Sequence, residues 1–174
     1  SLQIALDMAA TADPSRTHQV VIDPGVRVVS PRVPFVLPPR PAGATGWVVR
    51  DLEMRCSAAT RTSSNAINIG ATFCLLKNVH IDAVSPNNYN QAVTNFSTCD
   101  FGTFEDCRFG NTLSHGITMG TGFTNAGPIR IRNCWIYSCG GNGILHSGTS
   151  GCYELTGNII AFNTTDGFHV NDST

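Results

Sequence analysis

The sequence is short of charge. Only 13% of its 174 residues are Asp, Glu, Lys or Arg, and the formal net charge is -1. Nucleic acids and anionic membrane surfaces are bound through dense basic patches, so neither is an expected partner. No apolar run approaches the roughly 20 residues of a membrane span, and membrane insertion is therefore not expected. Residues 1–10 lack the basic start of a secretory signal and carry Asp7.

Metal-binding spacings are also missing. The chain has seven cysteines, an odd number, but no CxxC pair, and its five histidines form no HExxH pattern. We therefore expect neither a metal nor another cofactor. Cys107 and Cys134 look like small buried hydrophobic residues, which favours free thiols and assembly in a reducing compartment.

What the sequence does contain is an internal repeat. Five pentads alternate between apolar and polar residues with the period of two that is typical of a half-buried strand. The pentads are residues 50–54, 77–81, 105–109, 132–136 and 156–160. Their last residues are spaced by 27, 28, 27 and 24 positions, and we expect these five to stack in one interior column. They are Met54, Ile81, Phe109, Ile136 and Ile160.

A second strand follows each pentad. It reads polar residue, Ala or Gly, then apolar residue, at 65–67, 91–93, 115–117, 142–144 and 166–168. The small middle residue suits a tight corner where a side chain would collide with the next copy. Leucine-rich repeats need Leu and Asn at fixed offsets, which are absent here, and propeller blades need about 40 residues. The pattern predicts an all-β solenoid of short strands stacked in parallel about 4.8 Å apart.

One copy of the repeat carries a family resemblance. Arg132-Asn133-Cys134-Trp135-Ile136, followed by Gly143-Ile144, resembles the x-N-C-x-I…G-I repeat of the pectin-lyase-like superfamily. The resemblance covers about residues 46–174 and implies a single-stranded right-handed parallel β-helix of about five coils. It is specific for the fold and says little about activity.

Residues 1–45 form a different segment. They predict a short amphipathic α-helix that ends at Asp13-Pro14, then strands and a proline-rich loop. Ile22-Asp23-Pro24-Gly25 resembles the V-x-I-P-x-G motif with which phage tail-spike β-helices often open, and this implies that the helix caps the solenoid. Because a solenoid needs a cap at each end and none follows 166–170, we expect the chain to be part of a longer one.

The alternation also predicts an outer face. The neighbours of the inward columns should point outward, where they bring together carboxylates, His, Arg and two aromatic side chains. We expect the aromatic rings to stack on sugars and the polar groups to bind hydroxyls, although a solvated sheet face is the alternative. The candidate substrate-binding residues are His80, Asp106, Arg108, Trp135 and Tyr137.

The same face offers a candidate catalytic pair. Glu53 and Asp82 lie one coil and two residues apart, so their separation should be roughly 8 Å. Inverting glycosidases hold their two carboxyl groups about 6.5–9.5 Å apart. Residues 113–120 resemble the G-H-G-I-S-I-G stretch of polygalacturonase-type hydrolases, but the aspartate pair of that family is missing. We therefore interpret His115 as a polar corner residue.

Three functions remain open. The first is a homotrimeric bacteriophage tail spike or tail fibre in the virion tail, which recognises host lipopolysaccharide or capsule and has the candidate pair for cleaving it. The second is a secreted microbial polysaccharide hydrolase or lyase of the same fold. The third is a structural β-helix spacer without a ligand. Fold alone does not choose among them.

Overall fold

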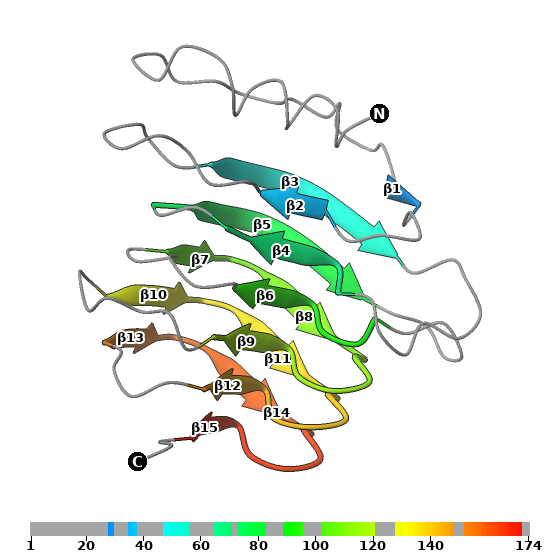
Figure 1. The fold of residues 1–174 in the computed structure, drawn as a ribbon, viewed down its shortest axis with the longest axis vertical. Coiled ribbons are helices and arrows are strands. Elements are labelled where there is room, and N and C mark those ends of the chain that lie inside the picture. The colour runs from blue at the N-terminus through cyan, green and yellow to red at the C-terminus, as the bar shows by residue number, and fades with distance from the viewer. Residues whose placement is uncertain are drawn as a thin grey trace.

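The chain winds into a parallel β-solenoid (Figure 1). The computed structural model describes residues 28–29, 35–37, 47–55, 65–70, 73–82, 89–95, 102–120, 128–147 and 152–171. Within these ranges every regular element is a strand, which confirms the all-β prediction. The predicted capping helix lies outside the described residues, and the right-handed sense stays a prediction.

The larger sheet has nine strands. It starts with β1 (Val28–Val29) and two long strands, β3 (Val48–Arg55) and β5 (Leu75–Asp82). In each later coil the long strand is replaced by two short ones. The first halves are β7 (Thr103–Glu105), β10 (Ile129–Arg132) and β13 (Tyr153–Thr156). The second halves are β8 (Arg108–Gly110), β11 (Trp135–Tyr137) and β14 (Ile159–Ala161).

The smaller sheet has six strands and lies in front of the larger one in Figure 1. Its strands are β2 (Phe35–Leu37), β4 (Ile67–Ile69), β6 (Val93–Asn95), β9 (Ile117–Met119), β12 (Ile144–His146) and β15 (Phe168–Val170). All neighbouring strands are parallel, and the register places each residue beside its counterpart in the next coil.

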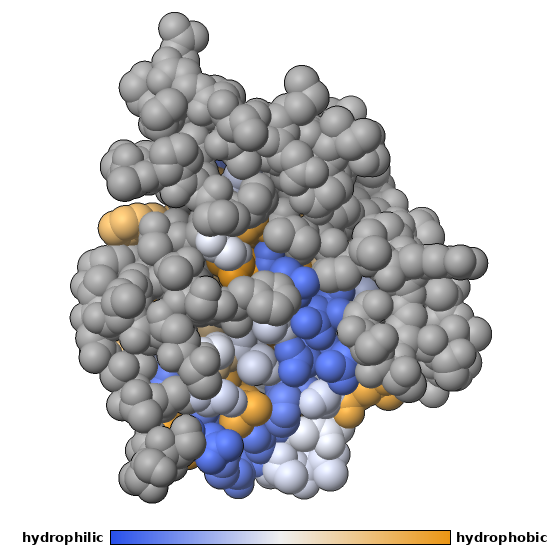
Figure 2. All heavy atoms as spheres, in the orientation of Figure 1, coloured by the Kyte–Doolittle hydropathy of each residue, from blue (hydrophilic) through white to orange (hydrophobic). Residues whose placement is uncertain are grey.

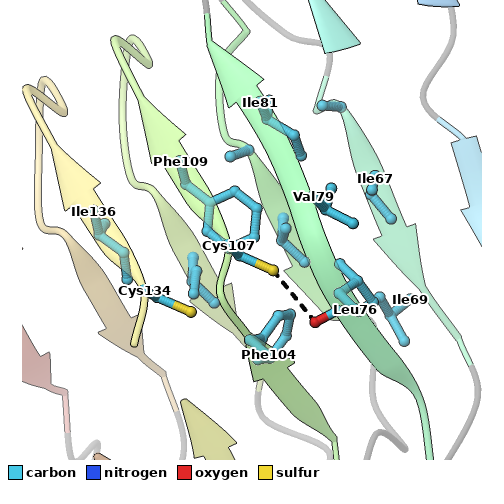
Figure 3. Close-up of a cluster of buried hydrophobic side chains, with 14 of the residues drawn as sticks. Ile67, Ile69, Leu76, Val79, Ile81, Phe104, Cys107, Phe109, Cys134 and Ile136 are labelled. Atoms are coloured by element: carbon cyan, nitrogen blue, oxygen red, sulfur yellow. Dashed lines mark hydrogen bonds between the residues drawn. The ribbon is translucent and has the colours of Figure 1, made fainter. Parts of the chain in front are cut away.

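The core consists of apolar columns that run along the solenoid (Figure 3). The predicted column from Met54 to Ile160 is confirmed, because the register joins each member to the next. Its first four members are at most 1% exposed. Burial of one such side chain contributes about 1.5–3 kcal/mol, so the columns supply most of the driving force for folding.

A corner interrupts the larger sheet where the sequence predicts continuous pentads. At this corner five stacked residues have positive φ and form what we call the corner ladder. Its members are Asp51, Asn78, Asp106, Asn133 and Gly157, with φ between 51° and 66°. Asp, Asn and Gly tolerate this left-handed conformation better than other residues do. Within the ladder the Asn78 Nδ2 donates to Asp51 Oδ1 at 2.8 Å, so amide and carboxylate side chains satisfy each other.

Two cysteines stack inside the solenoid next to the corner ladder. Cys107 and Cys134 are buried free thiols, as the sequence predicts. The Cys107 Sγ donates to the Leu76 carbonyl at 3.3 Å (Figure 3). A hydrogen bond with Cys134 and burial both raise the pKa of the Cys107 thiol. A raised pKa keeps this thiol protonated, and it acts as a small core residue.

The small residues before the six-stranded sheet mark a second tight corner. A Cβ added to Gly143 would lie 2.6 Å from the Cγ2 of Ile160 and 2.7 Å from the backbone oxygen of Gly167. Gly116 meets equivalent atoms one coil earlier, where the added Cβ would be 2.7 Å from the oxygen of Gly143. The glycines at positions 116 and 143 are therefore required by the close approach of the next coil.

We expect Gly143→Ala to lower the free energy of unfolding by about 1–3 kcal/mol, because the methyl group would press on backbone of the next coil. Gly167→Ala is the matched control in the same column. Its added Cβ would meet nothing nearer than 3.4 Å, so its stability should be close to that of the parent chain. Urea unfolding of both variants measures the difference, and equal losses would contradict the corner interpretation.

Candidate functional site

The candidate site lies on the outer side of β3, β5, β8, β11 and β14, which we call the aromatic face. It consists of two columns in register. The first is Glu53, His80, Arg108, Trp135 and Ile159, and the second is Asp82, Gly110, Tyr137 and Ala161. Six of the seven predicted site residues are therefore stacked on four neighbouring strands. The seventh, Asp106, belongs to the corner ladder.

Arg108, Trp135 and Tyr137 form a compact cluster on this face. The guanidinium carbon of Arg108 lies 4.3 Å from the Trp135 ring centroid and 5.2 Å from that of Tyr137. The two aromatic rings are 4.8 Å apart and tilted by 39°. Such cation–π contacts contribute about 0.5–2 kcal/mol each and fix the orientation of the rings. Trp135 remains 38% exposed, so part of a firmly held indole faces solvent.

Tyr137 is more covered than the sequence predicts, at 9% exposure. Its ring folds back over Gly110 of the preceding coil, where an added Cβ would lie 2.4–2.7 Å from ring carbons. Burial raises the pKa of the Tyr137 hydroxyl, an effect that the nearby Arg108 opposes and Asp82 reinforces. The hydroxyl therefore stays a neutral hydrogen-bonding group at physiological pH.

The acidic end of the aromatic face lies on β3 and β5. Asp82 accepts a hydrogen bond from Asn111 Nδ2 at 2.7 Å, which orients its carboxylate. Glu53 is half-buried beside His80, its register partner in the next coil, and His80 is exposed. Carboxylates, an imidazole and an aromatic cluster thus share one continuous surface. Hydrogen-bonding groups beside an exposed aromatic ring are the combination that suits a sugar chain.

Asp106 is placed differently from the other predicted site residues. It sits at the corner that borders the aromatic face, where Asn133 Nδ2 donates to its Oδ1 at 3.4 Å. Its other oxygen is 3.9 Å from the Lys77 ammonium. These contacts give Asp106 a structural role at the corner.

The neighbouring face, formed by β7, β10 and β13 with the first halves of β3 and β5, pairs its charges internally. Lys77 lies 2.9 Å from Glu105, and Arg130 and Arg132 lie 2.9 and 3.3 Å from Glu154. Arg108 differs, because within the described residues it forms no ion pair and its charge lies over aromatic rings. On the aromatic face the charge of Arg108 is thus held against aromatic rings and not by a carboxylate.

Figure 2 shows a hydrophilic band along the solenoid in the view that faces the six-stranded sheet. Polar corner residues before its strands bond to the next coil: His115 Nδ1 accepts from the Asn142 N–H at 2.9 Å, and Asn142 Oδ1 accepts from the Asp166 N–H at 3.0 Å. Burial lowers the pKa of His115, with a smaller effect from His169. His115 is therefore a polar corner residue, as the sequence indicates.

Comparisons with known proteins add no assignment. No family model, no curated protein and no solved structure matches the chain. Within the described ranges, no group of three or more His, Cys, Asp or Glu side chains is arranged to hold a metal ion. The same ranges contain no helix of the length and hydropathy needed to cross a membrane. The aromatic face therefore has to be interpreted from its own geometry.

Sequence reasoning missed two residues that shape the site. Gly110 makes room for the Tyr137 ring, and Asn111 orients Asp82. A glycine stacked one coil before a tyrosine is a visible signal for the first, since large and small residues pair across strands. Asn111 has a left-handed φ of 53°, which the spacing of the pentads does not reveal.

We expect Gly110→Ala to displace the Tyr137 ring and loosen its contact with Trp135. The near-ultraviolet circular dichroism signal should fall, whereas stability should drop by only about 1 kcal/mol because a flexible side chain yields. The control is the same change in a Tyr137→Leu background, where it should have no further spectral effect. An unchanged spectrum in the parent background would contradict the stacking of Tyr137 over Gly110.

Proposed function

We propose that this chain is the glycan-binding solenoid of a bacteriophage tail spike or tail fibre. In this proposal the solenoid is right-handed and pectin-lyase-like, assembles as a homotrimer in the virion tail, and binds host lipopolysaccharide or capsule through the aromatic face. The observation that carries the proposal is Trp135, an exposed indole held in place by Arg108 and Tyr137.

Rigidity of the cluster supports this function. A ring that is already oriented loses little conformational entropy when a ligand stacks on it. Guanidinium nitrogens of Arg108, together with the carboxylate of Asp82 and the imidazole of His80, supply donors and acceptors for sugar hydroxyls next to the ring. A spacer with no ligand has no need for an arginine withheld from ion pairs beside a half-exposed tryptophan.

Trp135→Ala should weaken binding of the full chain to the glycan it recognises by about 1–3 kcal/mol, because the stacking surface is lost. Binding is measured on a panel of immobilised lipopolysaccharides and capsular polysaccharides, followed by titration of the one retained. Light scattering should give the same number of chains, three, for parent and variant.

The matched control is Phe73→Ala, which also removes an exposed ring, 54% accessible, from a site before β5 and away from the aromatic face. It should leave binding unchanged. If no glycan on the panel is retained, or if Trp135→Ala binds as tightly as the parent, the proposed function is wrong. A stable monomer would contradict the trimer.

Cleavage of the bound polysaccharide is a second candidate function, favoured by Glu53 and Asp82 on the same face. Their register predicts a separation of roughly 8 Å, which suits an inverting hydrolase in which a water molecule attacks between the two carboxyl groups. The hydrogen bond from Asn111 holds Asp82 in one orientation, as a catalytic carboxylate requires.

For this activity Glu53→Gln should lower the rate of chain shortening at least about 100-fold and leave affinity near the parent value, because the amide keeps the shape but cannot exchange the proton. Size-exclusion chromatography of the polysaccharide after incubation measures the shortening. Equal rates for parent and variant would show that Glu53 is not part of the mechanism. If the parent does not shorten the polysaccharide, the cleavage proposal is wrong and only the binding proposal stands.

A further inference from the structure

The hydroxyl end of Tyr137 reaches from β11 toward the strand that carries Asp82. Of the atoms near a Cβ added to Gly110, the closest is Tyr137 Cζ at 2.4 Å, the ring carbon that bears the hydroxyl. Gly110 lies between the two residues in register, because it pairs with Tyr137 on one side and with Asp82 on the other. The side chain of Tyr137 therefore lies across β8, and its hydroxyl is directed toward β5.

Hydrogen bonds connect Tyr137 to a cation and to a carboxylate. Burial has the largest effect on the pKa of the Tyr137 hydroxyl and raises it. A hydrogen bond with Arg108 lowers this pKa, whereas the charge of Asp82 and a hydrogen bond with it raise it. A guanidinium group only donates hydrogen bonds and a carboxylate only accepts them. The Tyr137 oxygen therefore accepts from Arg108, and its hydroxyl donates to Asp82.

The carboxylate of Asp82 is held from a second direction as well. Asn111, which follows Gly110 in the chain, donates its Nδ2 to Asp82 Oδ1 at 2.7 Å. An ionised carboxylate offers about four acceptor positions, so two donors orient it and leave capacity for further donors. Asp82 is half-buried, and the hydroxyl groups of a sugar are donors of the kind that it can accept. An oriented acceptor discriminates against a ligand that offers no donor to it.

Asp82 and Trp135 lie far enough apart to set a minimum length for the ligand. They are separated by two coils and two residues, which corresponds to about 12 Å. Both lie on coils with a described neighbour on either side, since β3 precedes β5 and β14 follows β11. A single pyranose ring does not span that separation, whereas an oligosaccharide does.

We propose that Asp82 is the hydroxyl-recognising end of the glycan site and that Tyr137 and Asn111 are the positioning residues of its carboxylate. The ligand is then an oligosaccharide that stacks on Trp135 and offers a hydroxyl group to Asp82. This inference rests on the proposed function. Because the carboxylate is oriented before the ligand arrives, binding requires little reorganisation.

The test uses size-fractionated fragments of the polysaccharide retained in the panel described above, from the monosaccharide upward, with the full chain. Tyr137→Phe removes the hydroxyl and keeps the ring over Gly110, so the near-ultraviolet circular dichroism signal should match the parent. Titration should show that binding of long fragments weakens about fivefold and that the monosaccharide is unaffected. Trp135→Ala should weaken binding of every fragment.

A second background separates positioning from a merely structural role. In an Asp82→Ala chain, Tyr137→Phe should have less than about a twofold further effect, because the group that it positions is gone. Asn111→Gly keeps the left-handed φ of 53° and removes the amide, so it should behave like Tyr137→Phe. Tyr153→Phe is the matched control, since its hydroxyl bonds to His146 Nδ1 at 2.6 Å, and it should leave binding unchanged at every length.

The outcomes separate this inference from the proposed function. If Tyr137→Phe and Asn111→Gly leave the binding of long fragments unchanged while Trp135→Ala weakens it, the positioning of Asp82 is wrong and the proposed function stands. If no fragment binds the parent chain, both are wrong. A full effect of Tyr137→Phe in the Asp82→Ala background, or on the monosaccharide, would show that Tyr137 does not act through Asp82 and would overturn the inference.

Discussion

Backbone hydrogen bonds between successive coils hold each residue of the solenoid beside its counterpart in the next coil. They fix the spacing at about 4.8 Å, and a shift of register by one residue would turn a whole strand inside out. Interior columns, the corner ladder and the aromatic face all depend on that constraint. Arg108, Trp135 and Tyr137 meet because β8 and β11 are paired in register, although they are 27 residues apart in the chain.

The corners decide which side chains share a face. At the corner ladder one left-handed residue in each coil turns the chain between two faces with different properties. One of these faces pairs its lysine and arginines with glutamates, and such exposed ion pairs contribute little to stability. The other keeps Arg108 over aromatic rings. The corner ladder is thus the boundary between a structural surface and a candidate binding surface.

Spacing along the chain predicted the columns correctly. The repeat length sets which residues lie side by side in neighbouring coils, and the two-residue alternation sets which of them point inward. Spacing could not predict the break at Asp106, since a left-handed residue preserves the alternation on either side of it. It also predicted an exposed Tyr137, whereas the ring lies over Gly110. The covering of Tyr137 depends on the direction in which its side chain tilts along the solenoid axis, and the alternation of apolar and polar residues does not predict that direction.

The packing of Tyr137 over Gly110 requires the coils that carry β8 and β11 to remain adjacent. Solenoids change length by gaining or losing whole coils, and most such events preserve the columns because every coil is alike. A coil inserted between β8 and β11 would place a new residue under the tyrosine ring and part Trp135 from Arg108. Insertion on either side of that pair would leave the cluster intact. In related chains of different length, the counterparts of Gly110 and Tyr137 should therefore occur together, always one coil apart.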